Sequence, residues 1–350
     1  MLPQIATFFI DYQCNFTCEH CSISSSPSTK TTMADELMDS IFEQMKKVPS
    51  FKVVVFTGGE TTLQKEKLIK GLNIAHNSGW STRVVTNAWW ATSKEKADEF
   101  IKELVAEGLN EINTSFDDYH AKFNSIDNIV HFVEASLNNN IKPVIATITD
   151  NYSKYNSKYI QAYMAKSLNI DLNELNKKIF FMESKPSPNG RGANLKNDVN
   201  RMPAYLADDE LKIRKGCTEV GRAISFHPDG SIKVCCGHAS MEIQDLSVGN
   251  LYSESLEVIL GRVRSNLVFW LIHTLGPKCL LEKLGVNKEY LSPCDACYDL
   301  LINHRKEMLE YVIKHKNELL LNEVILTDNK RRELNNYKTI ILPKKVEQHA

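Results

Sequence analysis

The segment Cys14-Asn15-Phe16-Thr17-Cys18-Glu19-His20-Cys21 follows a short apolar run, Ala6–Ile10, near the start of a chain of 350 residues. Three thiolates this close together can bind three corners of a cubane iron–sulfur cluster, because thiolates are the usual ligands of such clusters. No fourth cysteine lies nearby in the sequence, so one iron would keep an open position for an exogenous ligand. The alternative is a zinc knuckle that takes its fourth ligand from His20 or from elsewhere in the chain.

Outward from this motif, short apolar runs alternate with amphipathic stretches as far as Phe181. The apolar runs predict strands at Ala6–Ile10, Lys52–Thr57, Arg83–Thr86, Glu111–Phe116, Pro143–Thr147 and Lys178–Met182. The amphipathic stretches predict helices at Ala34–Val48, Leu63–Asn77, Lys94–Ala106, Ile126–Leu137 and Tyr155–Ser167. Strands that alternate with helices in this way are joined by right-handed crossovers into a parallel sheet, so we predict an α/β fold.

The pattern changes after residues 186–201, which are rich in Pro, Gly, Ser and Asn. Beyond them, Ile224–Phe226 and Ile232–Val234 flank a His-Pro-Asp-Gly turn and predict a β-hairpin. Two helices are predicted at Leu256–Leu275 and Asp299–Leu320. We therefore expect a core domain of residues 1–200, a smaller domain of residues 201–320 and a tail of residues 321–350.

The composition excludes several classes of protein. Hydrophobic residues make up 43% of the chain and charged residues 24%, as in an ordinary soluble globular protein. The net charge of −1 gives no reason to expect nucleic acid or an anionic membrane as a partner. The first ten residues carry no secretory signal, and the longest apolar run, Leu267–Leu275, is too short to span a membrane. We therefore expect a cytoplasmic protein. Because the cytosol keeps cysteines reduced, metal binding or catalysis explains its nine cysteines better than structural disulfides do.

The spacing of Cys14, Cys18 and Cys21 at the end of a first strand resembles the signature of radical S-adenosylmethionine (SAM) enzymes. The resemblance implies a partial (β/α)6 barrel in which these cysteines hold a 4Fe-4S cluster. Its open iron would be chelated by the amino and carboxylate groups of SAM. One electron, from a donor such as flavodoxin or ferredoxin, would then cleave SAM to a 5′-deoxyadenosyl radical that abstracts a substrate hydrogen.

Thr57-Gly58-Gly59-Glu60 ends the second predicted strand, where this family carries a glycine–glycine–glutamate motif for the SAM ammonium group. Glycines let the backbone approach a ligand closely, and a glutamate can accept hydrogen bonds from a cation. We therefore expect Gly58, Gly59 and Glu60 to bind SAM. His20, inside the cysteine motif, is grouped with them as a cofactor-binding candidate.

Three further polar residues match positions that bind SAM in related enzymes. Asn87 follows the third predicted strand and Ser115 closes the fourth, where relatives bind the ribose or the methionine moiety. Arg191 lies in Asn189-Gly190-Arg191-Gly192, where related enzymes place an arginine for the SAM carboxylate. The alternatives are a turn asparagine, a strand-end serine and an arginine that faces solvent.

A second group of cysteines resembles the SPASM extension of radical SAM enzymes that modify peptides. Cys217, then Gly230 with four residues before Cys235, matches the opening of that extension, and the segment Cys294-Asp295-Ala296-Cys297 matches its closing pair. The resemblance implies that these four cysteines hold a second, auxiliary 4Fe-4S cluster. A four-cysteine zinc site is the alternative.

Cys236 directly follows a predicted cluster ligand, Cys235. Successive side chains of a strand point to opposite faces, so Cys236 is expected to face away from the cluster and into the mouth of the barrel. A thiol at that place could donate a hydrogen atom to a substrate carbon radical. The alternative is a buried thiol without a role.

Over residues 5–305 the chain resembles the YydG-like radical SAM peptide epimerases. The matching segments are Cys21–Pro27, Phe56–Glu60, Asp117–His120, Asp229–Cys236, Ser265–Leu267 and Cys294–Cys297. The chain departs from these relatives at Ala223, where they can carry an acidic residue.

This resemblance implies that the enzyme converts L- to D-residues in a ribosomally synthesised precursor peptide, with Cys236 as the hydrogen donor. A second candidate is a radical SAM maturase that forms thioether or carbon–carbon crosslinks. A third is an iron–sulfur electron carrier or redox sensor that binds no SAM.

Overall fold

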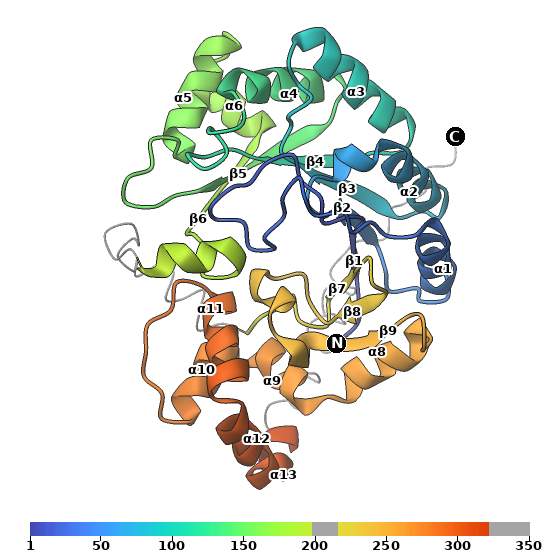
Figure 1. The fold of residues 1–350 in the computed structure, drawn as a ribbon, viewed down its shortest axis with the longest axis vertical. Helices are drawn as coiled ribbons and strands as arrows, with labels where there is room; N and C mark the ends of the chain where they lie inside the picture. The colour runs from blue at the N-terminus through green and yellow to red at the C-terminus, as the bar shows by residue number, and fades with distance from the viewer. Residues whose placement is uncertain (198–215, 322–350) are drawn as a thin grey trace, which may run out of the picture.

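The computed structural model describes residues 1–197 and 216–321. Parallel strands alternate with helices, and Figure 1 shows the helices around the outside of the strands. The strands are β1 (Ile5–Phe9), β2 (Val53–Thr57), β3 (Ser81–Thr86), β4 (Glu111–Ser115), β5 (Lys142–Ile148) and β6 (Phe180–Ser184). The helices are α1 (Asp35–Met45), α2 (Lys65–Asn77), α3 (Lys94–Ala106), α4 (Ile126–Asn138), α5 (Ser157–Ser167) and α6 (Leu172–Lys178). The predicted partial (β/α)6 barrel is confirmed.

The sheet continues past the barrel strands into the C-terminal part of the chain. Its order is β6-β5-β4-β3-β2-β1-β7-β8-β9, where the last three strands are β7 (Ala223–Phe226), β8 (Ser231–Lys233) and β9 (Ser247–Asn250). Strand β7 pairs with β1 in parallel, whereas β8 and β9 are antiparallel. The predicted hairpin is therefore β7–β8, and it extends the barrel sheet.

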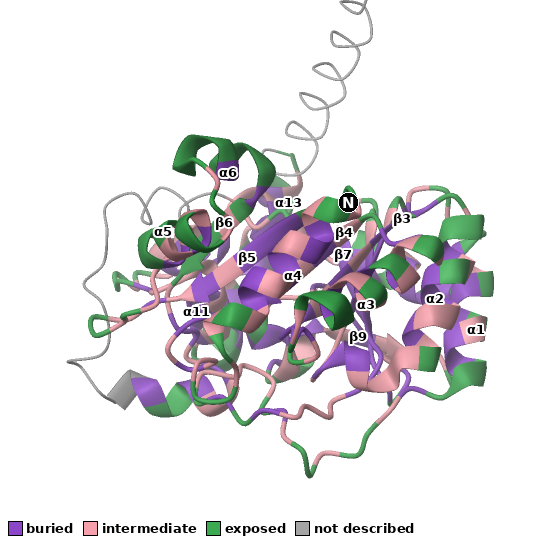
Figure 2. Ribbon diagram, turned by 90° about the horizontal axis from the view of Figure 1, so that it is seen from above, coloured by how far each residue is buried: buried purple, intermediate pink, exposed green. Residues whose placement is uncertain are grey.

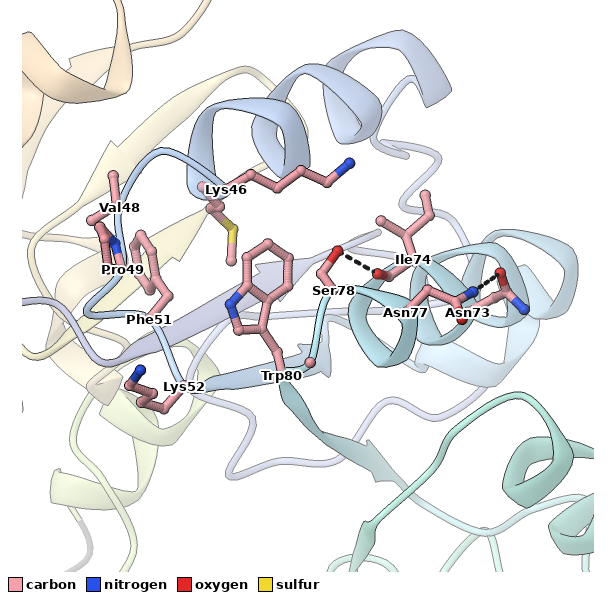
Figure 3. A pocket seen from close by; sticks show the side chains of 12 residues that line it. Lys46, Val48, Pro49, Phe51, Lys52, Asn73, Ile74, Asn77, Ser78 and Trp80 are labelled. Atoms are coloured by element: carbon pink, nitrogen blue, oxygen red, sulfur yellow. Dashed lines mark hydrogen bonds between the residues drawn. The ribbon is translucent and has the colours of Figure 1, made fainter.

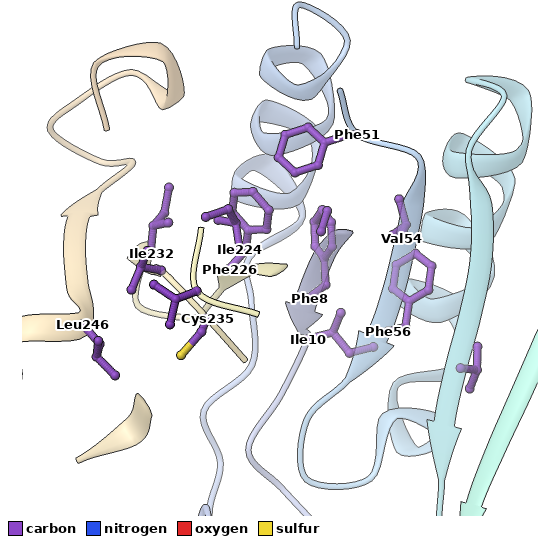
Figure 4. Close-up of a cluster of buried hydrophobic side chains, with 14 of the residues drawn as sticks. Phe8, Ile10, Phe51, Val54, Phe56, Ile224, Phe226, Ile232, Cys235 and Leu246 are labelled. Atoms are coloured by element: carbon purple, nitrogen blue, oxygen red, sulfur yellow. The ribbon is translucent and has the colours of Figure 1, made fainter. Parts of the chain in front are cut away.

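One hydrophobic core joins the barrel to this hairpin. The ring of Phe8 on β1 stacks on Phe42 of α1 at a centroid distance of 4.8 Å and lies 5.1 Å from Phe226 on β7. Figure 4 shows Phe8, Phe56 of β2 and Phe226 in the same cluster as Cys235. Figure 2 shows buried positions along the strands and exposed positions on the outer faces of the helices. Because burial of apolar surface is the main favourable term in folding, the hairpin and the barrel stabilise each other.

The C-terminal helices are shorter than the sequence pattern predicts. They are α8 (Leu256–Ser265), α9 (Leu267–Thr274), α10 (Pro277–Lys283), α11 (Pro293–Tyr298), a π-helix (Asp299–Asn303), α12 (Arg305–Lys314) and α13 (Lys316–Leu319). The prediction of one helix over Leu256–Leu275 is wrong, because Asn266 has an extended backbone and its side chain accepts hydrogen bonds from the amides of Val268 and Phe269. An asparagine in that role starts a new helix.

The prediction of one helix over Asp299–Leu320 is also wrong, because the helix is interrupted at His304 and at His315. Strand β6 begins two residues later than predicted, since Lys178 still belongs to α6. The proposed boundary between residues 200 and 201 and nearly all of the proposed tail lie outside the described residues. No helix in the described part of the chain is long and apolar enough to cross a membrane.

Candidate active site

The loops that follow β1 to β4 converge at the carboxyl ends of the parallel strands, where enzymes built on such barrels place their active sites. They enclose a cavity of about 130 Å³. The residues predicted to bind the first cluster or SAM all line it: Cys14, Cys18, His20, Cys21, Gly58, Gly59, Glu60, Asn87, Ser115 and Arg191. Residues from five separate segments of the chain therefore meet at one site.

Three side chains beside the cysteine loop lie close together. Across residues 1–197 and 216–321, the ligating atoms that all lie within 4.8 Å of one another belong to His20, Asp117 and His120. Cys14, Cys18 and Cys21 line the same cavity as His20 and His120. The prediction that each of the three thiolates binds a different iron of one cluster stays a prediction.

The thiols of Cys14 and Cys18 are protonated in the metal-free protein. Burial is the main cause that raises the pKa of Cys14, to about 12, against a hydrogen bond from the amide of Phe16 that lowers it. Burial also raises the pKa of Cys18. Binding of iron would therefore release protons from this loop, as expected for thiolate ligands.

The Gly58-Gly59-Glu60 segment is fastened to the loop that carries the cysteines. The amide of Gly59 donates to the carbonyl of Asp11 at 3.1 Å, and the amide of Glu60 donates to the carbonyl of Gln13 at 2.7 Å. A Cβ atom on Gly59 would overlap the Gln13 carbonyl. Only glycine allows the two loops to approach this closely.

Glu60 joins the ends of β2 and β3. Its carboxylate accepts hydrogen bonds from the amide and hydroxyl of Thr62, the hydroxyl of Thr86 and the amide of Asn87. The side chain is buried, and burial raises its pKa in spite of these bonds. Glu60 thus orders the wall of the cavity, and its contact with SAM stays a prediction.

Arg191 and Asn87 present polar groups to the same cavity. The Nε of Arg191 donates to the carbonyl of Cys18 at 2.9 Å, while its buried Nη2 has no hydrogen-bond partner. The amide of Asn87 donates from Nδ2 to Asn15 at 2.9 Å. A buried guanidinium nitrogen without an acceptor costs free energy. Arg191 is therefore suited to the carboxylate of a ligand such as SAM.

Asp117 orders the turn that carries His120 to the cavity wall. Its carboxylate accepts from the amides of Tyr119 and His120, both at 3.0 Å, and contacts Nδ1 of His120 at 2.9 Å. Burial opposes ionisation, but His120 and these bonds lower the pKa of Asp117 to about 2. Burial lowers the pKa of His20, 3.9 Å from the same carboxylate, to about 4, so His20 is neutral.

A neighbouring cavity of about 350 Å³ extends from the first site to Cys236. Cys21 and Gly58 line it together with Cys236 and Glu219. Cys236 therefore faces this cavity, as predicted, but not by strand alternation, because β8 ends at Lys233, before both cysteines. Burial, followed by the charge of Glu219, raises the pKa of Cys236 to about 11, so its sulfur carries a hydrogen at neutral pH.

The four other predicted ligands gather beside this cavity. A Cβ on Gly237 would lie 3.0 Å from Sγ of Cys294 and 3.8 Å from Sγ of Cys235, so both sulfurs face one point. Burial, then the charges of Cys294 and Cys217, raise the pKa of Cys297. The auxiliary cluster on these four cysteines stays a prediction, with a four-cysteine zinc site as the alternative.

Three polar residues at or beside the cavities are absent from the residues predicted from sequence: Thr7 and Glu219, which line the cavity of Cys236, and Asp11, which lies buried against Gly58. Thr7 is a polar residue inside an apolar strand, Asp11 is an acidic residue at the end of a buried apolar run, and Glu219 lies two residues after Cys217. The first two carry a signal that could have been used, because polar groups are buried only for a reason. Glu219 supplies a carboxylate to the cavity on whose wall Ala223 also lies.

Ionisation of the buried Asp11 side chain lowers the stability of the folded protein, and this effect depends on pH. Asp11 is fully buried, and burial followed by the charge of Glu60 raises its pKa from 3.8 to about 7. Below pH 3.8 the folded and unfolded chains are both protonated, and stability is lost as pH rises from 3.8 through 7. We compare the unfolding free energies of Asp11→Asn and of the parent at pH 5 and at pH 8. We expect the difference in favour of Asp11→Asn to be larger at pH 8 than at pH 5, by about 2–3 kcal/mol. Urea titrations at both pH values measure this, and a difference that does not change with pH would contradict it.

A hollow of about 660 Å³ lies at the opposite end of the barrel (Figure 3). It is bordered by Phe51 and Lys52, which precede β2, and by Trp80, which precedes β3. None of the side chains that line it belongs to the residues predicted to bind cofactors.

Comparisons with known proteins agree with this geometry. The family described as the Radical SAM superfamily matches residues 10–150. The chain is 26% identical over 336 residues to YydG of Bacillus subtilis (strain 168), a protein named for peptide biosynthesis, and the match spans 91% of this chain and 99% of YydG. Its fold is similar to native anSMEcpe with bound AdoMet and Cp18Cys peptide, at a TM-score of 0.50 and 14% identity, over 91% of this chain and 99% of that one.

Proposed function

We propose that the chain, whose residues 10–150 match the Radical SAM superfamily, is a radical SAM enzyme that inverts L-residues to D-residues in a ribosomally synthesised precursor peptide. The single observation that carries the proposal is the shared cavity, which Cys21 and Gly58 line together with Cys236. Inversion needs one group that removes the α-hydrogen and another that returns a hydrogen to the opposite face. A cavity between the first site and a lone thiol provides both positions.

Cys14, Cys18 and Cys21 would hold a 4Fe-4S cluster, and Cys217, Cys235, Cys294 and Cys297 a second one. The match of both cysteine sets to the motifs of this family supports clusters over zinc. The pocket residues named above would hold SAM, with Arg191 toward its carboxylate. When bound, the first cluster and SAM supply the 5′-deoxyadenosyl radical that removes a hydrogen atom from the substrate.

The residues of the chain perform the rest of the reaction. Cys236 returns a hydrogen atom from its S–H bond to the substrate α-carbon radical, which forms the new C–H bond and leaves a thiyl radical on Cys236. One electron from a reduced flavodoxin or ferredoxin and one proton restore the thiol. Glu219, on the wall of the same cavity, is placed to supply that proton.

The known relatives support a peptide substrate. The name of YydG assigns that protein to peptide biosynthesis, and it covers nearly the same length as this chain. The protein of similar fold holds AdoMet and a peptide together. No property of the described residues suggests nucleic acid as the substrate, and the net charge of −1 agrees with this.

Replacement of Cys236 tests the proposal. In deuterated water, the parent enzyme with the short peptide encoded beside its gene is expected to add one deuterium per D-residue. We expect Cys236→Ala to lower D-residue formation at least about tenfold while 5′-deoxyadenosine still forms, because only the hydrogen donor is lost. Chiral amino-acid analysis and mass spectrometry measure both products.

Cys279→Ala is the matched control, because Cys279 lies on α10 and lines neither cavity at the two cysteine groups. It is expected to keep the parent yield of D-residues. Full D-residue formation by Cys236→Ala would refute the proposal. A product that is two hydrogens lighter would instead indicate a thioether or carbon–carbon crosslink.

A further inference from the structure

Two hydroxyl side chains meet the paired cysteines from neighbouring strands. Thr7 of β1 and Ser225 of β7 are register partners, so their side chains point to the same face of the sheet. Thr7 and Cys236 line the same cavity, where the Thr7 side chain lowers the pKa of the Cys236 thiol against the larger, raising effect of burial. The hydroxyl of Ser225 donates to the carbonyl oxygen of Cys235 at 2.9 Å. Each of the two cysteines therefore has a hydroxyl group beside it.

Ser225 is itself fixed by a chain of hydrogen bonds. Its Oγ lies 2.9 Å from Nε2 of His227, and Nδ1 of His227 lies 2.7 Å from the hydroxyl of Tyr12. Because Ser225 donates its single proton to Cys235, it must accept from Nε2–H of His227. Nδ1 then accepts from Tyr12, and every proton in the chain has one possible place.

His227 is well suited to this fixed tautomer. It is buried, and its ring stacks on Phe9 with centroids 4.6 Å apart and an interplanar angle of 17°. Burial, then the charge of Lys233, lowers its pKa to about 3, so the ring is neutral and offers one donor and one acceptor. Tyr12 lies two residues before Cys14, so the hydrogen-bond chain runs from the first cysteine loop to the second.

We propose that Thr7 and the Tyr12–His227–Ser225 chain are positioning residues that aim the thiol of Cys236 into the cavity. The carbonyl oxygen of Cys235 and the amide of Cys236 share one rigid peptide plane, so Ser225 fixes the direction in which the backbone enters Cys236. Thr7 then selects the orientation of the sulfur. The sulfur of Cys235 meanwhile lies, with the sulfur of Cys294, beside the α-carbon of Gly237. This inference rests on the proposed role of Cys236 as hydrogen donor.

The test compares Thr7→Val and Ser225→Ala with Ser231→Ala in the holoenzyme, using the short peptide encoded beside the gene. Ser231 is the matched control, because it lies in the same hairpin and its hydroxyl bonds only to Asp229 among the hydrogen bonds of the described residues. The measured quantity is the number of D-residues formed per 5′-deoxyadenosine. We expect this ratio to fall about three- to tenfold in Thr7→Val and Ser225→Ala, and to stay at the parent value in Ser231→Ala. Iron content and 5′-deoxyadenosine formation should stay near the parent values in all three.

Conservative variants separate positioning from packing. Thr7→Ser and Ser225→Thr keep the hydroxyl group and are expected to restore at least half of the lost ratio. An unchanged ratio in Thr7→Val and Ser225→Ala, while Cys236→Ala forms no D-residues, would overturn the positioning role alone. Loss of iron or of 5′-deoxyadenosine in both variants would also overturn it, since the hydroxyls would then be structural. Full D-residue formation by Cys236→Ala would overturn the proposed function and this inference together.

Discussion

Cys18→Ala is expected to abolish SAM cleavage, with 5′-deoxyadenosine reduced at least about 1000-fold, because the first cluster would lose one of its three protein ligands. Cys18 is buried, and the hydrogen bond from Arg191 to its backbone carbonyl holds it in place. We also expect iron to fall from about eight to about four atoms per chain, since the four cysteines of the second site are unchanged. Anaerobic reconstitution, iron analysis and liquid chromatography of the nucleoside measure these effects.

Cys279→Ala is the control for the loss of a thiol and should retain both the iron and the activity of the parent. The prediction would be contradicted if Cys18→Ala still produced 5′-deoxyadenosine at the parent rate. Zinc in place of iron in the reconstituted parent would contradict both the cluster and the proposed function.

Gly59→Ala is expected to weaken SAM binding at least about 100-fold and to lower the free energy of unfolding by about 2–4 kcal/mol. The added Cβ would overlap the carbonyl group of Gln13, which is backbone and cannot rotate away. Relief of that overlap would break the hydrogen bond from the amide of Glu60 to the same carbonyl and separate the glycine loop from the cysteine loop. Equilibrium binding of SAM and urea denaturation measure the two effects.

Gly261→Ala provides the matched control on α8. No atom lies within 4 Å of the Cβ that would be added there. Alanine is more favourable than glycine inside a helix, so the free energy of unfolding of this variant should be about 0.5–1 kcal/mol higher than that of the parent. Its affinity for SAM should equal that of the parent. Equal SAM affinities for Gly59→Ala and the parent would show that the two loops need not be in contact.

The position of the first site could be predicted from sequence because each of its motifs follows a strand. The cysteine loop follows β1, Gly58 follows β2, and Asn87 follows β3. Parallel strands bring their carboxyl ends to one edge, so short-range patterns were enough to predict which loops would meet. Arg191 was predicted from the family resemblance. Its side chain lines the cavity and its Nη2 is buried without a hydrogen-bond partner, which agrees with that prediction.

The parts that could not be predicted depend on contacts between distant segments. The pairing of β1 with β7 leaves no local signal, because both strands are short and apolar. The partners of Glu60 and the hydrogen-bond chain through His227 follow from that arrangement. The break at Asn266 was missed for a different reason: a single capping side chain outweighed a continuous apolar pattern.

The pairing of β1 with β7 has a consequence for stereochemistry. Residues that alternate along a strand exchange faces when the register moves by one position. If β7 moved by one position against β1, Ser225 would turn away from the face that Thr7 occupies, and its hydrogen bond to Cys235 would be lost. Under the proposed function, the register of β1 and β7 therefore sets the direction from which the thiol of Cys236 approaches the substrate.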